Sequence, residues 1–428
     1  MNIFMLGNGF DLHYCFPTKY INFLNTMMFL CENEDKRFET IDRIFGDPNL
    51  RQRDRDIARC YDRYKVYYPY VEIDQSALKN SVSKAKTNTW FKYFCEEFNT
   101  DVGWIDFEKE IAYVIRKLSE FFSEYDSFVE YDEDSRLTDE EKQDSIGDIL
   151  RLFSLGHFDA EGECSDGEEL IWSIQRDNDD EYFFLRKDIL NSDDSLRKSK
   201  IISELLTSLQ DFSTILSYYL HQFVEAPIPR LVRENKIRRE WLFTDKNAEI
   251  ITFNYTNTFE QLYDSDPKKV HHIHGVIDSD TDIVLGINAD KKDELSGLNT
   301  SFLPFKKYYQ RVVYQTDNSY VRLIRTVTDY KTLHNNTGEV CHLYIFGHSL
   351  NTNDKDAIKE LFGIADYIDI LYHSQDALSQ YVENLVTIYG KHKFDQLRVS
   401  KRLNFIPDRA LYDEEYAIEI GFKQNPAE

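Results

Sequence analysis

The chain has 428 residues, 42% of them hydrophobic, which is enough for a substantial core and for two domains or one domain with a large insertion. Its formal charge of -25 disfavours nucleic acid as the main partner, because affinity for a phosphate backbone rests on Lys and Arg. The six cysteines include no CxxC pair, and no apolar run approaches the roughly 18 residues that span a bilayer. The start of the chain carries no signal-peptide pattern. We therefore expect a cytoplasmic protein that uses neither a metal site nor a membrane.

The first predicted strand covers residues 3–6, a short apolar run that ends at a Gly-Asn-Gly turn. Helical periodicity begins after residue 18 and recurs to about residue 240. No convincing buried strand is evident in that part of the sequence. We therefore predict that residues 31–244 form a mostly helical insertion.

Residues 124–194 are strongly acidic, with 24 Asp and Glu against 6 Lys and Arg. Such a composition is typical of a solvated, poorly packed segment with acidic loops. A docking surface for a basic partner is the alternative that the composition leaves open.

Strand signals return after residue 248. Each is a short run of apolar, β-branched or aromatic residues, and they cover residues 249–253, 270–273, 283–285, 343–346 and 368–371. Nearly continuous apolar strands that alternate with helical stretches indicate a parallel sheet covered on both faces. The sequence therefore predicts an α/β fold with a Rossmann-like, doubly wound parallel sheet built from residues 1–30 and 245–428.

Polar or glycine residues follow four of these strands. They are Gly7, Asn8, Gly9, Phe10 and Asp11, then Asn254 and Thr256, then His274 and Gly275, and lastly Gly347, His348 and Ser349. In an open parallel sheet, ligands bind outside the carboxyl ends of the strands. We therefore predict that these residues meet at one binding site.

Three of these residues suggest specific roles. Gly7 and Gly9 have no Cβ, so their backbone N–H groups can approach a diphosphate, although a purely structural tight turn explains the pair equally well. Asn254 offers a carboxamide that can hold a ribose hydroxyl, and the alternative is an Asx-turn or a helix N-cap.

His274 stands between a strand and Gly275, where it can present an imidazole to a cleft. An imidazole there can take a proton from water or from a sugar hydroxyl, whereas the alternative is a core histidine with satisfied hydrogen bonds. His271 and His272 lie along the strand and point to opposite faces, which disfavours a metal site. We assign them packing or surface roles.

Two pairs of acidic residues precede helical segments. Asp106 and Glu108 are able to bind a metal, but an N-cap aspartate with an acidic first turn is the plainer interpretation. Asp354 and Asp356 likewise open a predicted helix.

Short motifs span nearly the whole chain in order: Gly7-Asn8-Gly9-Phe10-Asp11-Leu12, Pro17-Thr18-x-Tyr20 with Phe23, Trp104-x-Asp106-Phe107-Glu108, Phe253-Asn254-Tyr255-Thr256, His272-x-His274-Gly275, Leu285-Gly286-x-Asn288 and Gly347-His348-Ser349-Leu350. Together they resemble the bacteriophage abortive-infection AbiH family. That family is in turn similar to sirtuin-like NAD-binding proteins.

The resemblance implies a role for each matching residue. The Gly7–Gly9 turn would hold a dinucleotide, Asn254 would contact the nicotinamide ribose and His274 would be catalytic. Gly347 and Ser349 would contact the adenosine side, and Asn288 belongs to the same expected site. The resemblance departs at Thr256, because sirtuin-type sites carry an Asp there, near nicotinamide. The zinc-binding cysteines of the deacylases are also absent from the sequence, which disfavours protein deacylation.

The function implied is that of an antiphage effector, a hydrolase that binds NAD or a related nucleotide and cleaves its N-glycosidic bond without a further cofactor. We also expect a phage-derived trigger or regulatory partner and a homo-oligomer. A non-catalytic, nucleotide-sensing module that controls a partner is the main alternative. A defence nuclease that uses Asp106, Glu108 and the arginines between residues 51 and 63 is the other, and the acidic net charge weighs against it.

Overall fold

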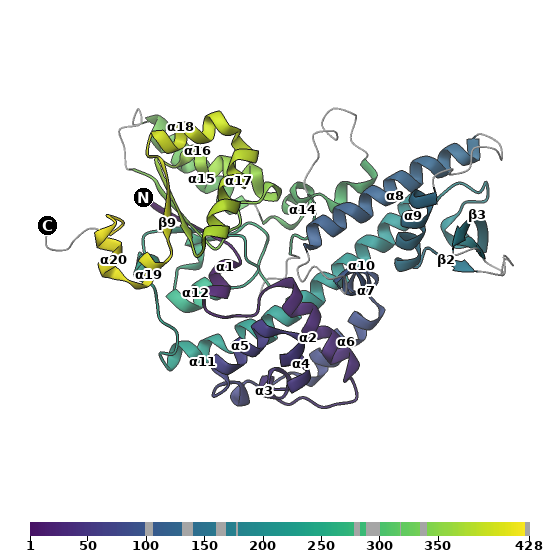
Figure 1. Ribbon diagram of the computed structural model, residues 1–428, viewed down its shortest axis with the longest axis horizontal. Coiled ribbons are helices and arrows are strands. Elements are labelled where there is room, and N and C mark those ends of the chain that lie inside the picture. Colours follow the sequence, from purple (N-terminus) through teal and green to yellow (C-terminus); the bar gives the residue numbers. More distant parts are fainter. Residues whose placement is uncertain are drawn as a thin grey trace.

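The computed structural model describes residues 1–98, 106–130, 140–159, 168–176, 179–277, 283–287, 300–316, 318–333 and 340–423. Its centre is a six-stranded parallel sheet in the order β6-β5-β1-β7-β8-β9 (Figure 1). The strands are β1 (Asn2–Leu6), β5 (Glu249–Thr252), β6 (Val270–His272), β7 (His342–Phe346), β8 (Tyr367–Tyr372) and β9 (Leu403–Pro407). Numbered along the chain within this sheet, the order is 3-2-1-4-5-6, which is the strand order of a Rossmann fold. The predicted fold class is confirmed.

Strand β1 lies in the middle of the sheet, and its side chains are buried on both faces. Ile3 and Met5 belong to one hydrophobic cluster, and Phe4 and Leu6 belong to a second cluster on the opposite face. The alternation follows from the two-residue period of a strand. A nearly continuous apolar sequence is therefore the signature of this doubly covered strand.

Helices cover both faces of the sheet. The cluster that contains Ile3 and Met5 includes side chains from α15 (Asn318–Leu333), α16 (Lys355–Ile364), α17 (Gln375–Tyr389) and α18 (Lys391–Val399). The opposite cluster receives side chains from α1 (Gly9–His13), α12 (Thr258–Tyr263) and α19 (Arg409–Tyr412). The last helix, α20 (Glu414–Glu419), follows α19 (Figure 1).

The chain between β1 and β5 is mostly helical, as predicted. Its helices are α2 (Tyr20–Glu32), α3 (Ile41–Phe45), α4 (Pro48–Arg53), α5 (Arg55–Tyr64), α6 (Gln75–Thr87), α7 (Thr89–Phe98), α8 (Phe107–Glu130), α9 (Glu140–Leu152), α10 (Lys198–Tyr219) and α11 (Ile228–Arg233). Many of their apolar side chains join the cluster that contains Phe4 and Leu6. The domain boundaries drawn at residues 30 and 245 stay a prediction.

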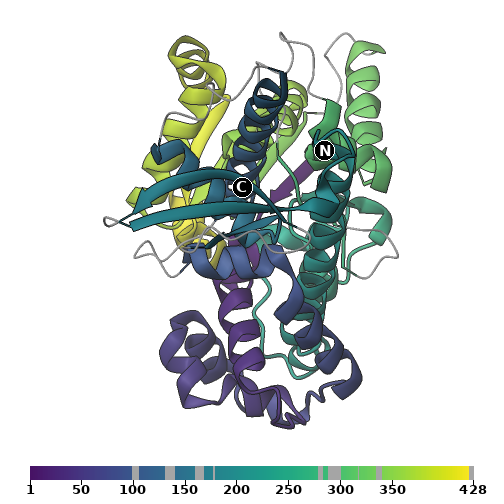
Figure 2. The ribbon, with the colours of Figure 1, turned by 90° about the vertical axis from the view of Figure 1, so that its right-hand side faces the viewer.

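A small antiparallel sheet corrects the expectation that this segment holds no strands. It has the order β2-β4-β3 and consists of β2 (Gly156–Asp159), β3 (Glu168–Arg176) and β4 (Asp179–Arg186). Phe183 and Leu185 of β4 are fully buried in the cluster that contains Phe4. The sheet lies at the end of α8 and α10 that is remote from the central sheet (Figures 1 and 2). The surrounding acidic residues masked the alternation of these strands in the sequence.

The prediction of strands needs correction at two further places. Residues 283–285 form no strand, because their backbone groups bond to neighbouring loops and side chains: Val284 N–H donates to the His274 carbonyl (2.8 Å), and the Tyr255 hydroxyl donates to the Val284 carbonyl (2.9 Å). The edge strand β9 was not predicted. It pairs in parallel with β8 from Leu403 to Pro407.

None of the helices in the described ranges has both the length and the apolar character required to cross a membrane.

The segments that directly follow β1 and β7, called here the exits of these strands, are joined by backbone hydrogen bonds. Gly7 N–H donates to the Phe346 carbonyl (3.1 Å), and Gly9 N–H donates to the Gly347 carbonyl (2.8 Å). A Cβ on Gly9 would lie 2.5 Å from Gly347 Cα, and Gly347 itself has a φ of +69°. Both glycines are therefore required where the two exits meet.

We expect Gly9→Ala to lower the free energy of unfolding by about 1–3 kcal/mol, because the new methyl group must displace backbone atoms rather than a flexible side chain. Gly363→Ala is the matched control, since a Cβ at this position in α16 meets no atom within 4 Å. Its stability should equal or exceed that of the wild type, by up to about 1 kcal/mol. Chemical denaturation measures both changes, and equal stability of the two variants would contradict the packing role of Gly9.

Candidate functional site

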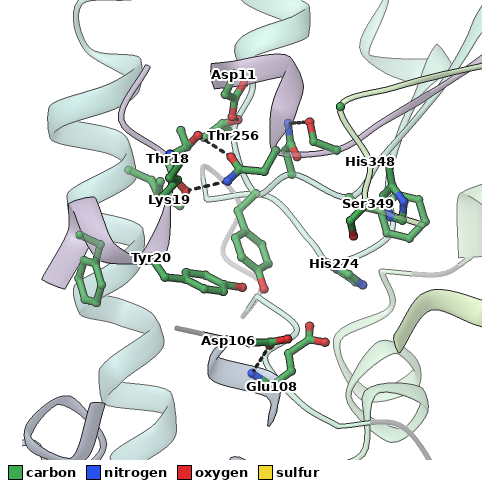
Figure 3. A pocket seen from close by; sticks show the side chains of 18 of the residues that line it. Asp11, Thr18, Lys19, Tyr20, Asp106, Glu108, Thr256, His274, His348 and Ser349 are labelled. Atoms are coloured by element: carbon green, nitrogen blue, oxygen red, sulfur yellow. Dashed lines mark hydrogen bonds between the residues drawn. The ribbon is translucent and has the colours of Figure 1, made fainter. Parts of the chain in front are cut away.

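A cavity of about 320 Å³ opens at the carboxyl ends of β1, β5, β6 and β7. From β1 the strand order continues through β5 and β6 on one side of the sheet, and from β7 it continues through β8 and β9 on the other side. The cavity therefore lies at the switch point, where Rossmann-like folds bind ligands. The predicted site residues that line the cavity are Gly7, Asn8, Asp11, Asn254, Thr256, His274, Gly347, His348 and Ser349. Helices that precede β5 contribute further residues, among them Tyr20, Asp106 and Glu108 (Figure 3).

Three predicted site residues that the structure describes do not line the cavity. Phe10 is 1% exposed and packs against the rings of Tyr14, Phe243 and Phe346. Gly9 is engaged with the exit of β7, and Gly275 is a buried residue with a φ of +81°. Asn288 lies outside the described residues.

The exit of β5 is tied to the exit of β1 by two side-chain hydrogen bonds. Asn254 Nδ2 donates to the Gly7 carbonyl (3.1 Å), and Thr256 Oγ1 donates to Asp11 Oδ2 (2.8 Å). Helix α12 is capped at Asn257, so the alternative assignment of Asn254 as a helix N-cap is wrong. Burial raises the pKa of Asp11 to about 7, even though its hydrogen bond from Thr256 opposes the rise.

Neighbouring histidines of β6 hold the strands and loops around the cavity. His272 contacts the Asn254 carbonyl through Nδ1 (3.1 Å) and Glu260 through Nε2 (2.7 Å). His271 contacts Glu249 (3.0 Å). Both therefore have packing roles. Within the described ranges, no group of three or more His, Cys, Asp or Glu side chains could hold a metal ion.

His274 is buried at the cavity wall, with its ring edge-on to Phe253. Arg311 donates to its Nε2 (3.0 Å), and Asp354 Oδ1 lies 3.4 Å from the same nitrogen. Since Arg311 is only a donor, this contact requires an unprotonated Nε2. Burial and the charges of Lys307 and Arg311 lower the pKa of His274 to about 3, against the opposing effect of Asp354. The imidazole is therefore neutral at pH 7.

A buried lysine joins two carboxyl groups beside His274. Lys307 opens α14 (Lys307–Tyr314), and its side chain is 2% exposed. Its Nζ lies 2.7 Å from Glu108 Oε1 and 3.1 Å from Asp354 Oδ1. The lysine therefore links helix α8 to the segment that follows β7.

Asp354 is the ionised member of this group. Burial opposes its ionisation, but the charge of Lys307 and a hydrogen bond from His348 hold the pKa of Asp354 well below its usual range. His348 Nδ1 accepts the Leu350 N–H (3.0 Å), so in the neutral ring Nε2 carries the proton and faces Asp354 Oδ2 at 3.5 Å.

Glu108 is the second residue of α8, and its side chain enters the cavity (Figure 3). Asp106 accepts the backbone N–H groups of Glu108 (3.1 Å) and Lys109 (3.3 Å), so its predicted N-cap role is confirmed. Asn353 Nδ2 donates to Glu108 Oε2 (2.9 Å). Burial raises the pKa of Glu108 to about 7; Lys307 opposes this shift, whereas Asp354 and Asp106 add to it.

The sequence did not indicate Lys307, Arg311 or Asn353 as site residues, and it indicated Asp354 only as the start of a helix. Lys307 and Arg311 are four residues apart on α14, so they share one face of that helix. That spacing was the available signal, but it is equally typical of a solvated helix.

The fold and the cavity together define a Rossmann-like α/β protein with a polar site at the switch point of its sheet. The family model described as "Bacteriophage abortive infection AbiH" matches residues 3–370. The chain belongs to this family, whose function is abortive-infection defence against bacteriophage. Neither a curated protein nor a solved structure shows significant similarity to it.

We expect Lys307→Met to destabilise the protein by about 3–5 kcal/mol, because it leaves Glu108 and Asp354 buried without their shared cation. Lys84→Met is the matched control, since the Lys84–Asp211 pair has side-chain exposures of 35% and 45%. Loss of such a half-exposed pair costs at most about 1 kcal/mol. Urea unfolding at pH 7 measures the difference, and a similar loss in both variants would show that Lys307 does not hold the two segments together.

Proposed function

We propose that the cavity binds NAD or a related nucleotide and hydrolyses its N-glycosidic bond, and that this reaction arrests phage growth. One observation carries the proposal: the exits of β1, β5, β6 and β7 contribute Gly7, Asn254, His274 and His348 to a single cavity at the switch point. Rossmann-like sheets bind nucleotides at this position. The order of these residues also matches the motifs that resemble sirtuin-like NAD-binding proteins.

The character of the cavity fits a small ligand with polar groups. Its volume of about 320 Å³ falls at the lower end of the range of roughly 300–1,000 Å³ found for ligand pockets. Aromatic residues such as Tyr20, Phe253 and Tyr255 line it together with the polar strand exits. Apolar walls with a few placed polar groups are the usual composition of such a site.

In the proposed reaction, water attacks C1′ of the ribose while the bond from C1′ to the base nitrogen breaks. The bonding pair leaves with nicotinamide, and the attacking water loses one proton. Asn254 and His274 would hold the ribose hydroxyl groups. The sequence suggests His274 as the general base, but its low pKa favours a hydrogen-bonding role over the transfer of a whole proton.

Thr256, the departure from sirtuin-type sites, does not leave the cavity without a carboxyl group. Thr256 donates to Asp11, and both residues line the cavity. A carboxyl group from the β1 exit thus lies beside position 256, where sirtuin-type sites carry an Asp. This arrangement supports a nucleotide site despite the substitution.

A nucleotide-sensing module is the second candidate, and one contact favours it. Arg311 already donates to the His274 nitrogen that would accept a proton. The nuclease alternative gains no such support. Its basic segment lies on α4 and α5, where Arg51 pairs with Asp62 and Arg53 pairs with Glu32.

Release of nicotinamide by the purified protein tests the proposal. We expect His274→Ala to abolish release and phage protection, yet to keep dinucleotide affinity within about tenfold, or about 1.4 kcal/mol. Asn254→Ala should also abolish release and should weaken binding more, because it holds the ribose directly. Thermal shift with added dinucleotide measures binding independently of turnover.

His271→Ala is the control, because His271 lies on β6, the strand that precedes His274, but contacts Glu249 rather than the cavity. It should retain turnover if it folds. Full phage protection by His274→Ala would remove this residue from the reaction. Binding of dinucleotide by the wild type without any release of nicotinamide would favour the sensing module.

A further inference from the structure

Three distant parts of the chain supply a cluster of charged groups, of which Glu108 and Asp354 line the cavity. Glu108 comes from α8 in the segment between β1 and β5, Lys307 comes from α14, and Asp354 follows β7. Glu108 and His274 point toward the same part of the cavity (Figure 3). The Rossmann-like strands therefore form only part of this site.

We propose that Glu108 is the acid–base residue of the nucleotide hydrolysis, delivered to the cavity of the parallel sheet by helix α8. This inference rests on the proposed function and names the residue that handles the proton. It gives the helical segment a direct chemical role.

The two carboxyl groups around Lys307 are held in different states. Asp354 is kept ionised by Lys307 and His348, whereas the pKa of Glu108 lies at about 7. When neighbouring titratable groups have pKa values pushed apart in this way, one stays charged and the other exchanges protons. A group with a pKa near the working pH is the most efficient general acid or base.

The competing groups of the cavity are less suited to this task. His274 is neutral and is already bonded to Arg311, and His348 uses Nδ1 to accept the Leu350 N–H. Asp11 also has a pKa raised to about 7, but it is 1% exposed and is held by Thr256. The Glu108 side chain is 13% exposed, so water from the cavity can reach it.

The contacts of Glu108 allow its carboxyl group to gain or lose a proton while the side chain stays in place. Oε1 contacts Lys307 and Oε2 accepts from Asn353, so two donors remain in place when one oxygen gains a proton. The titratable or charged groups around it, taken element by element, are Asp106 at the start of α8, Lys307 and Arg311 on α14, Asp354 after β7, His274 after β6, and Tyr20 and Tyr255 across the cavity.

In the proposed reaction, Glu108 takes up the proton that the attacking water loses. Its carboxylate accepts a proton from the water whose oxygen forms the new bond to C1′. The C1′–N bond breaks, and nicotinamide leaves with the bonding pair. Glu108 later gives the proton to solvent, so that one water is consumed and one proton is released in each turnover.

The test compares Glu108→Gln with Glu120→Gln, which makes the same change on the same helix at a residue that does not belong to the described cavity lining. We expect Glu108→Gln to lower kcat by about 10²–10⁴-fold, with KM changed by less than about threefold. The rise of kcat with pH near 7 should disappear, because the carboxylate form is no longer created there. Glu120→Gln should keep both the rate and the pH profile.

A second variant, Glu108→Asp, and a binding measurement with ADP-ribose distinguish the loss of the acid–base group from a failure to fold. Glu108→Asp retains a carboxyl group and should recover part of the rate together with a rising pH profile. Both Glu108 variants should bind ADP-ribose with near wild-type affinity.

Two results would overturn the inference while leaving the proposed function intact. One is a wild-type pH profile in an active Glu108→Gln. The other is loss of the ionisation near pH 7 in Asp11→Asn but not in Glu108→Gln. A wild type that releases no nicotinamide would overturn the proposed function and this inference together.

Discussion

The site depends on the charge of Lys307, which is almost completely buried and therefore needs anionic partners. A lysine that loses its water is stable in charged form only when carboxylates replace the lost hydration. Glu108 and Asp354 provide them, at 2.7 and 3.1 Å. These partners come from α8 and from the exit of β7. The need of the Lys307 ammonium group for anionic partners therefore joins two segments that are separated by about half the chain.

This arrangement couples the helices to the proposed nucleotide site of the sheet. An abortive-infection protein must be restrained until infection, because uncontrolled loss of a nucleotide such as NAD would harm the host. If Glu108 performs proton transfer, a movement of α8 changes the rate without any change at Asn254 or His274. Helix α8 packs against α9, and α9 packs against the small sheet β2-β4-β3, so this sheet is linked to the helix that carries the proposed acid–base residue.

The sequence predicted the parallel sheet well, because strands buried on both faces leave continuous apolar runs. It also predicted that Asn254, His274 and His348 share a site, since the exits of parallel strands meet at one edge. Strand β9 was missed because Asn404 and the terminal Pro407 weaken its pattern. Lys307 could not be found from the sequence. A lysine on a helix normally indicates solvent, and only the folded chain reveals its two carboxylate partners.

We propose the switch-point cavity as the nucleotide site. A crystal structure of the protein with ADP-ribose, the expected product, is the decisive test because this ligand cannot turn over. We predict that the ribose lies between Asn254 and His274, with its C1′ facing Glu108. Density for ADP-ribose elsewhere on the protein, or an empty cavity at a concentration that saturates binding in solution, would show that this cavity is not the nucleotide site.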